Sequence, residues 1–244
     1  MNQGTQAELL ARAQSGDREA LEALLSSVQP QLYRFSLKMC RHNEDAEDVL
    51  QDAMIAIAKS VKGFRGDASL STWLFSITRS FCIKKRRRSK FAPKREESFD
   101  GLVETQTMDL STEIPSPDVQ LESREIWQQV HAAIREIEPA YREILVLRDI
   151  EGLSAKEVAE VVDLTVPAVK SRLHRARAQL RTLLAENPYR PASGCPDIRQ
   201  VFSHYLEGEL SQDVCHTMQS HVMQCITCAR ECEGLKLALN ACVK

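Results

Sequence analysis

Apolar residues recur every three to four positions along almost the entire chain, and this spacing restricts the fold more than any other feature. Early members of the pattern are Leu9, Leu10 and Ala13, and a later set is Val49, Ala53 and Ile57. Such a period places apolar side chains on one face of a helix, whereas the alternation that marks a strand is weak throughout. The sequence therefore predicts an all-α protein.

Interruptions of this period divide the 244 residues into four parts. One segment is rich in proline, serine, threonine and acidic residues and has too few large apolar side chains to fold by itself, so we expect a flexible linker there. The expected parts are a helical domain at 1–92, an acidic linker at 93–122, a second helical domain at 123–187 and a cysteine-rich tail at 195–244.

The net charge of -2 conceals a strong segregation of charge along the chain. Residues 79–95 hold nine Lys or Arg and no acid, and residues 96–122 hold eight acids and no base. Such blocks indicate more than one charged partner surface.

The compartment follows from what the sequence lacks. No window approaches the roughly 18 consecutive apolar residues that span a bilayer, and the polar N-terminus has no signal-peptide pattern. We therefore expect a cytoplasmic protein without a membrane partner. Since thiols stay reduced there, the six cysteines after Pro191 favour metal or redox chemistry, whereas Cys40 and Cys82 are expected to pack as small hydrophobic side chains.

The second domain contains the pattern of a helix-turn-helix. A short helix follows Ser154, a turn lies at 163–165, and a second helix carries Pro167 in its first turn. From 167 to 181 this second helix has five Lys or Arg and no acid, although a merely solvated basic face usually includes acids for ion pairs. We therefore expect it to contact DNA through Lys170, Ser171, Arg172, His174, Arg175 and Arg177.

The first domain has two further charged features. Asp45, Glu47, Asp48 and Asp52 lie opposite the apolar face of their predicted helix, which by itself is typical of a solvated surface. Farther along, Arg79 and the cations at 84–88 accompany Trp73, Phe75 and Phe81. Aromatic rings with cations suit a surface that stacks unpaired bases. The alternative is that the rings belong to the hydrophobic core and that the cations form a loose, solvated segment. The sequence pattern alone leaves this alternative open.

These motifs resemble a known family. Region 2 of the extracytoplasmic-function (ECF) sigma factors is similar to the runs Asp-Ala-Glu-Asp-Val-Leu-Gln-Asp at 45–52, Phe-Arg-Gly-Asp at 64–67 and Ser-Thr-Trp-Leu at 71–74. Region 4 of that family is similar to Tyr-Arg-Glu-Ile-Leu-Val-Leu-Arg at 141–148 and to the helix-turn-helix with its run at 169–177. The resemblance covers roughly residues 5–185, and the chain departs from the usual pattern at Ser80, Lys84 and Ala168.

The resemblance implies two macromolecular partners, core RNA polymerase and promoter DNA. It implies that the polymerase clamp binds Asp45, Asp48, Gln51 and Asp52. It further implies that the minus-ten element is melted and held by the loop at 62–72 and the helix after it, through Arg65, Trp73, Arg79, Ser80, Lys84, Arg86 and Arg87. Region 4 would read the minus-35 element, and the linker would enter the active-centre cleft. No enzyme activity and no small-molecule substrate are expected, because no phosphate loop or activated nucleophile is present.

The tail carries metal-ligand spacing. His221, Cys225 and Cys228 are four and three residues apart, and Cys195 precedes them. Three thiolates and one imidazole form a closed, structural Zn²⁺ site, which would help so short a tail to fold. Three cysteines lie outside this set, namely Cys215, Cys232 and Cys242. Cys232 continues the ligand stripe by four residues and could compete for the metal or belong to a second, softer site. The alternative is that one or two of the three are buried and inert.

The tail from Cys195 to Cys228 also resembles the zinc-binding anti-sigma domain, and a cysteine-rich tail resembles the CorE-type metal-responsive sigma factors. This implies regulation in cis by zinc, copper or cadmium, with thiol oxidation as a competing signal and inhibition favoured over activation. The alternative is a stand-alone, metal-responsive helix-turn-helix regulator, which would need neither the acidic helix nor the acidic linker.

Overall fold

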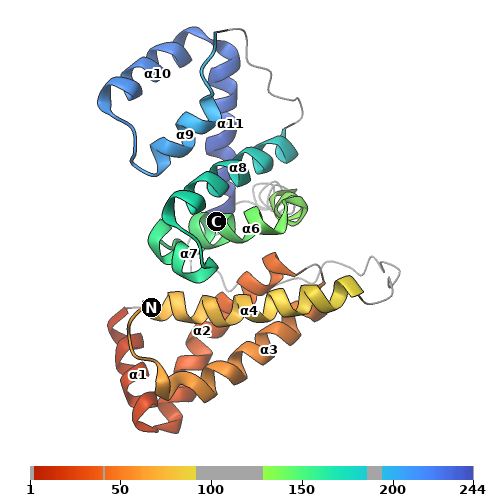
Figure 1. Cartoon of the computed structure of the whole chain (residues 1–244), viewed down its shortest axis with the longest axis vertical. Coiled ribbons are helices and arrows are strands. Elements are labelled where there is room, and N and C mark those ends of the chain that lie inside the picture. Colours follow the sequence, from red (N-terminus) through yellow and green to blue (C-terminus); the bar gives the residue numbers. More distant parts are fainter. Residues whose placement is uncertain (1–2, 41, 92–128, 186–193, 244) are drawn as a thin grey trace, which may run out of the picture.

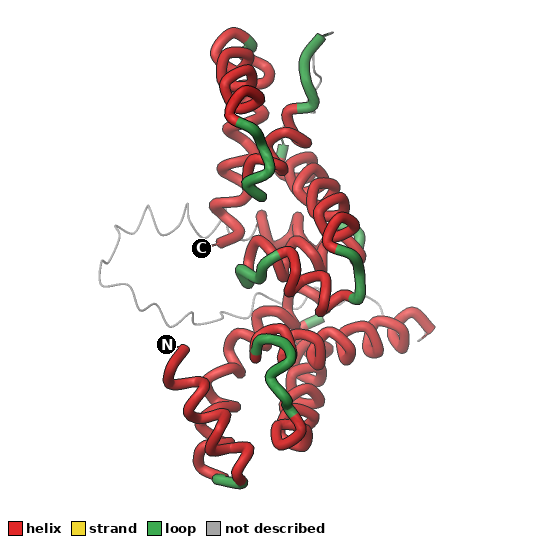
Figure 2. Tube along the Cα trace, turned by 60° about the vertical axis from the view of Figure 1, so that its left-hand side comes forward, coloured by secondary structure: helices red, strands yellow, loops and turns green. Residues whose placement is uncertain are grey.

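The protein is helical throughout the part that its computed structural model describes, which is residues 3–40, 42–91, 129–185 and 194–243. Figure 2 shows helices joined by loops, and those residues include no strand, so the all-α prediction is confirmed. The expected linker at 93–122 lies outside the described residues. In Figure 1 the elements form three layers along the long axis, with α1 to α4 at one end and α9 to α11 at the other.

The first layer is a helical bundle. Its helices are α1 (Gln3–Ser15), α2 (Arg18–Met39), α3 (Asn43–Ser60) and α4 (Leu70–Phe91). Asp17 caps α2 by accepting the backbone N–H of Ala20, and a 3₁₀ turn follows α3. The core is built from fully buried residues such as Leu24 and Ile57, and Phe35 packs edge-on against Phe75 with ring centroids 5.1 Å apart.

The second layer contains the predicted helix-turn-helix. Residues 129–136 are helical, α6 (Pro139–Leu145) continues into a π-helical turn at Val146–Ile150, and α7 (Ala155–Val162) and α8 (Val166–Leu184) follow. Ser154 and Glu157 form a capping box that begins α7. Asp163 turns the chain with a left-handed φ of 56°, and Thr165 caps α8. Local cap chemistry thus produces the motif where the sequence predicts it.

The third layer is the tail, with α9 (Ile198–Leu206), α10 (Gln212–Gln224) and α11 (Ile226–Val243). Helices α9 and α11 both pack against α8, as Figure 1 shows. Helix α10 has no buried residue and lies at the far end of the molecule. The tail is therefore attached to the helix-turn-helix layer through two of its three helices.

Polar contacts join the first layer to the second. Helix α4 lies along α7, and the hydroxyl of Ser69 donates to Glu157 at 2.8 Å. Arg79 pairs with Glu143, and the amide of Gln31 donates to Glu151 at 3.3 Å. The first and second layers thus contact one another through α4 and α7 and through polar pairs beside them. Among the described residues, no helix combines the length and the apolar character required to cross a membrane.

Candidate nucleic-acid interface and metal centre

The predicted polymerase-binding residues lie on α3. Ala46, Val49, Ala53 and Ile57 bury one face of this helix in the bundle. The opposite face presents Asp48, Gln51 and Asp52 to solvent, whereas Asp45 is half-buried. The helix therefore presents an acidic, solvent-exposed surface that its own core does not use.

A groove runs between this acidic face and α4. Asp48, Gln51 and Asp52 line it on one side, and Phe81, Lys84, Lys85 and Arg88 line it on the other. Lys85 bridges the two helices through Asp48 at 2.6 Å and Asp45 at 3.1 Å. The hydrogen bond from Asp48, with a smaller contribution from Asp45, raises the pKa of Lys85 although partial burial opposes it. The groove thus offers charges of both signs beside an aromatic edge.

The loop before α4 and the first turns of that helix carry the predicted minus-ten residues. Arg65 is exposed, and the Trp73 ring lies against Phe64 with centroids 5.0 Å apart. Phe75 is fully buried, so for this ring the core alternative holds. Trp73 is only half-buried and keeps part of its surface accessible.

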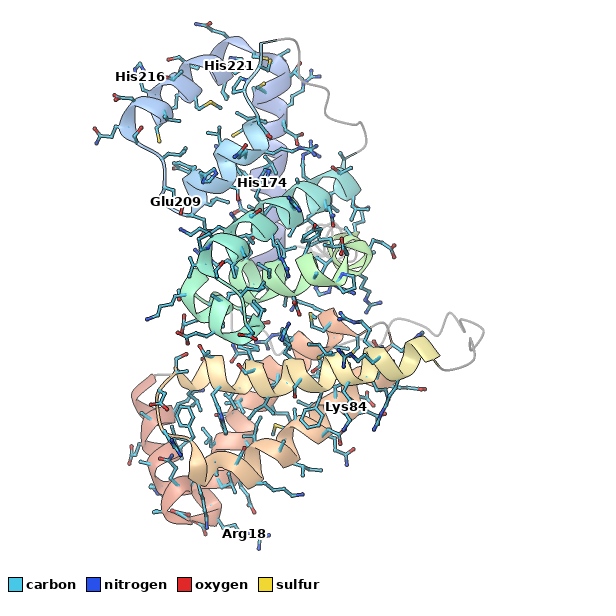
Figure 3. All side chains as sticks on the ribbon, viewed as in Figure 1. Arg18, Lys84, His174, Glu209, His216 and His221 are labelled. Atoms are coloured by element: carbon cyan, nitrogen blue, oxygen red, sulfur yellow. The ribbon has the colours of Figure 1, made fainter. Side chains whose placement is uncertain are left out.

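The cationic side chains of α4 differ in their exposure and in their partners. Lys84, Arg86 and Arg87 are exposed, and Lys84 lies over the Phe81 ring, 6.0 Å from its centroid (Figure 3). Ser80 is exposed as well and donates to the carbonyl of Ile77. Arg79 instead donates to both carboxylate oxygens of Glu143, at 2.9 and 3.1 Å. One of the predicted DNA-contacting side chains, Arg79, is therefore paired with a carboxylate of the second layer in this structure.

Helix α8 presents the predicted minus-35 residues on two neighbouring stripes. Ser171 and Arg175 are exposed, Arg172 is half-buried, and Arg175 reaches the Tyr141 hydroxyl at 3.3 Å. These residues form the open stripe of α8.

The other stripe faces the tail. Lys170 pairs with Glu209, and burial lowers the pKa of His174, which is half-buried beside α9 (Figure 3). Arg177 is only 4% exposed and pairs with Asp149 at 2.6 Å and Glu207 at 3.1 Å. Arg177 is therefore held in ion pairs inside the protein, whereas the sequence predicted that it contacts DNA.

The four predicted metal ligands converge. The donor atoms of Cys195, His221, Cys225 and Cys228 all lie within 4.8 Å of one another. The Cys195 and Cys225 sulfurs are 3.8 Å apart, and His221 Nε2 is 3.3 Å from the Cys228 sulfur. A tetrahedral centre with Zn–S bonds of about 2.3 Å has S···S edges of about 3.8 Å. The residues present thus fit a four-coordinate metal.

Local structure brings these ligands together and favours the thiolate. His221 lies in the last turn of α10, and Cys225 lies between α10 and α11, where the backbone N–H of Cys228 lowers the pKa of the Cys225 thiol. Cys215 lies on α10 outside this group, and burial raises the pKa of Cys232 on α11. The side chain of Cys242 lies outside the described part of the chain. We find no second group of this kind in the described residues.

Sequence reasoning missed the acids that hold α8. Glu207, Glu209 and Glu231 come from the tail, and Asp149 comes from the π-helical turn after α6. The one available signal was the absence of any acid in α8 itself, since a helix with this many cations must find its counter-charges on other elements or on a ligand.

Family models match both helical layers. The model described as "Sigma-70 region 2" matches residues 24–92, and that described as "Sigma-70, region 4" matches residues 127–180. Neither match extends into the tail.

Known sigma factors are similar to this chain over most of its length. The ECF RNA polymerase sigma factor SigM of Mycobacterium tuberculosis is 33% identical over 178 residues, which are 73% of this chain and 84% of the relative. The RNA polymerase sigma-H factor of Pseudomonas aeruginosa is 30% identical over 70% of this chain and 89% of its own length.

A solved structure, that of CnrH in complex with the cytosolic domain of CnrY, matches at 26% identity with a TM-score of 0.52, covering 74% of this chain and 97% of that chain. Sigma factors are transcription initiation factors and not enzymes, and the match of both sigma regions favours a sigma factor over a stand-alone helix-turn-helix regulator. With both sigma regions matched in order and a relative covered over most of its length, the chain belongs to the ECF sigma factors of the sigma-70 family.

Proposed function

We propose that the chain directs promoter-specific initiation by docking the exposed acidic face of α3 on core RNA polymerase. The observation that carries this proposal is the orientation of Asp48, Gln51 and Asp52, which point away from the core and line a groove shared with α4. Complementary charges across such a contact steer association and set its register. The polymerase clamp is the expected partner of this surface.

Charge reversal tests the docking surface. Asp48→Lys combined with Asp52→Lys should abolish co-elution with core polymerase and leave the helical circular dichroism unchanged, because neither side chain is part of the core. Glu19→Lys with Glu22→Lys is a matched control, since both acids are exposed on α2 of the same bundle. Normal holoenzyme assembly by the α3 variant would remove the main support for this assignment.

We further propose that the two helical layers divide the promoter. Trp73, Arg65 and the exposed cations of α4 would hold the melted minus-ten strand, and the α8 residues would bind the minus-35 duplex. Aromatic stacking with nearby cations suits unpaired bases, whereas a cationic helix after a tight turn suits a groove. The linker at 93–122 would then lie between the two promoter elements in the polymerase cleft.

For the tail we propose a zinc-bound regulatory domain that acts in cis. The ligand distances suit zinc, and the thiolate-rich donor set would also accept copper or cadmium as a signal. A fused tail has a very high effective concentration, so a weak contact with the sigma domains is sufficient. The structural neighbour CnrH was solved in complex with the cytosolic domain of CnrY, and the tail would make a comparable contact within one chain.

In vitro transcription tests this regulation. A chain truncated after Asn187 should transcribe constitutively and ignore added zinc, cadmium or copper if the tail inhibits, which is the direction we expect. Loss of transcription at every metal concentration would instead make the tail an activator. A truncated protein that tracks metal as the full-length chain does would contradict regulation by the tail, and an oxidant titration in parallel tests the thiol alternative.

A further inference from the structure

Four basic side chains of α8 lie on one stripe that faces the tail. Lys170, His174, Arg177 and Arg181 are spaced by four, three and four residues, so they share one face of the helix. This covered stripe is distinct from the open stripe of Ser171 and Arg175 on the same helix.

Three acids of the tail neutralise the covered stripe. Glu209 pairs with Lys170, Glu207 pairs with Arg177 at 3.1 Å, and Glu231 pairs with Arg181 at 3.2 Å. The acids come from the segment after α9 and from α11, so two separate elements of the tail form ion pairs with one helix. Their spacing places one carboxylate beside each of three cations along α8.

Glu231 fixes the position of this contact. Its side chain is only 2% exposed and lies between two guanidinium groups, that of Arg181 on α8 and that of Arg199 on α9, the latter at 2.6 Å. A buried carboxylate between two guanidiniums is stable only while both partners remain, since loss of a partner leaves a buried charge uncompensated. The pairing therefore works only when α9, α11 and α8 are docked together.

Because Gly234 has no side chain, the Arg181 guanidinium can lie against α11. A Cβ atom at Gly234 would lie 2.5 Å from both Cζ and Nη2 of Arg181, which is closer than non-bonded atoms approach. The guanidinium thus lies directly on the α11 backbone, one turn after Glu231. Any larger residue at 234 would force the Arg181 side chain away from Glu231.

We propose that the acidic face of the tail and duplex DNA compete for the covered stripe of α8, so that tail docking and minus-35 binding exclude one another. The tail acids offer carboxylates where DNA would offer phosphates, so a phosphate that approached Lys170 would meet the negative charge of Glu209 and the docked tail. This inference rests on the proposed function of α8 as the duplex reader, and it names the ligand that the tail displaces.

A quantitative consequence follows from the competition. If only the undocked fraction of molecules binds DNA, the apparent dissociation constant is the intrinsic one divided by that fraction. Weakening the docked state therefore tightens DNA binding without any change in the residues that contact DNA.

The test uses the full chain with one substitution at a time. Glu231→Gln, Gly234→Ala and Glu209→Gln each weaken the docking contact at a different point, and Glu233→Gln is the control, because Glu233 is exposed on α11 two residues from Glu231 and loses the same charge. Three quantities are measured: hydrogen exchange of the α8 and α11 amides, affinity for a labelled random-sequence duplex, and bound zinc per chain.

The three docking variants should exchange faster in α8 and α11, keep their zinc, and bind the duplex on the order of threefold to tenfold more tightly. Glu233→Gln should match the unsubstituted chain in all three measurements. Because Glu209 is distant from the metal ligands in sequence and contacts Lys170 directly, its variant decides the matter if either α11 variant loses zinc.

Two results overturn the proposal. Faster exchange with unchanged duplex affinity would show that the docked tail does not obstruct DNA, and unchanged exchange in all three variants would show that these acids do not hold the tail. Failure of the proposed function looks different: the open-stripe substitution Arg175→Ala would then leave duplex affinity unaltered, whether the tail is docked or weakened.

Discussion

The guanidinium of Arg79 on α4 donates two hydrogen bonds to the Glu143 carboxylate on α6, at 2.9 and 3.1 Å. This bidentate pair joins the region 2 layer to the region 4 layer. Glu143 is buried, whereas Arg79 keeps some exposure. Since Arg79 is also a predicted promoter contact, the pair implies that the two layers must separate before Arg79 can reach DNA.

Glu143→Gln should loosen the contact between the layers. The substitution removes the charge that holds Arg79, and loss of one buried partner typically costs roughly 1–3 kcal/mol. We expect a larger radius of gyration by small-angle X-ray scattering and faster hydrogen exchange in α4 and α6. Glu136→Gln serves as control because that acid is exposed in the preceding helix. An unchanged radius together with unchanged exchange would mean that Arg79 does not hold the layers together.

Replacing Cys225 and Cys228 with Ser should unfold the tail. Folding of so small a metal domain depends on the free energy of metal binding, and two of the four donors would be lost. Helical circular dichroism should fall and bound zinc should disappear, with α1 to α8 unaffected. Cys215→Ser is the control, since Cys215 lies outside the ligand group, and it should retain both metal and helicity. A doubly substituted chain that keeps full helicity would contradict a structural metal.

Local signals explain why the helix-turn-helix and the ligand set were predictable. Ser154, Glu157 and Thr165 cap helices through contacts three residues away, and the metal ligands His221, Cys225 and Cys228 are close in sequence. These parts of the two patterns can therefore be read from residues three or four positions apart, whereas Cys195 lies 30 residues before Cys225.

Contacts between distant segments could not be read in this way. Lys170 and Glu209 are 39 residues apart, and Arg79 and Glu143 are 64 apart. Whether such pairs meet depends on how whole layers dock, which no local period encodes. For the same reason Arg177 was grouped with the DNA contacts: its charge is visible in the sequence, whereas its burial against Asp149 is not.

His131 should make the protein less stable in mild acid. Burial, reinforced by the charges of Lys38 and Arg135, lowers the pKa of His131 from 6.5 to about 4. Between those values the unfolded chain binds a proton that the folded chain does not, so the free energy of unfolding falls as pH drops from 6.5 toward 4. The slope is at most about 1.4 kcal/mol per pH unit, and partial exposure of the ring reduces it.

His131→Asn should remove this part of the acid sensitivity. Denaturant unfolding at pH 7 and pH 5 measures it, and the difference between the two pH values should shrink in the variant. His216→Asn is the control, because His216 is exposed on α10. An equal pH difference in the variant and the parent would assign the acid sensitivity to the carboxylates instead.

The last prediction separates two arginines that lie two residues apart on α8. Arg175 is exposed on the open stripe, so Arg175→Ala should weaken duplex binding by roughly 1–3 kcal/mol if it contacts bases, and leave thermal stability unchanged. Arg177 is buried between Asp149 and Glu207, so Arg177→Ala should leave Asp149 without its ion-pair partner and Glu207 with Arg148 alone, and cost about 3–5 kcal/mol of stability. Thermal unfolding and fluorescence anisotropy with a labelled duplex, applied to both variants, resolve the two effects. If Arg177→Ala unfolds at the parent temperature while losing affinity for DNA, its interior ion pairs are dispensable and Arg177 contacts DNA, as its charge alone first suggested.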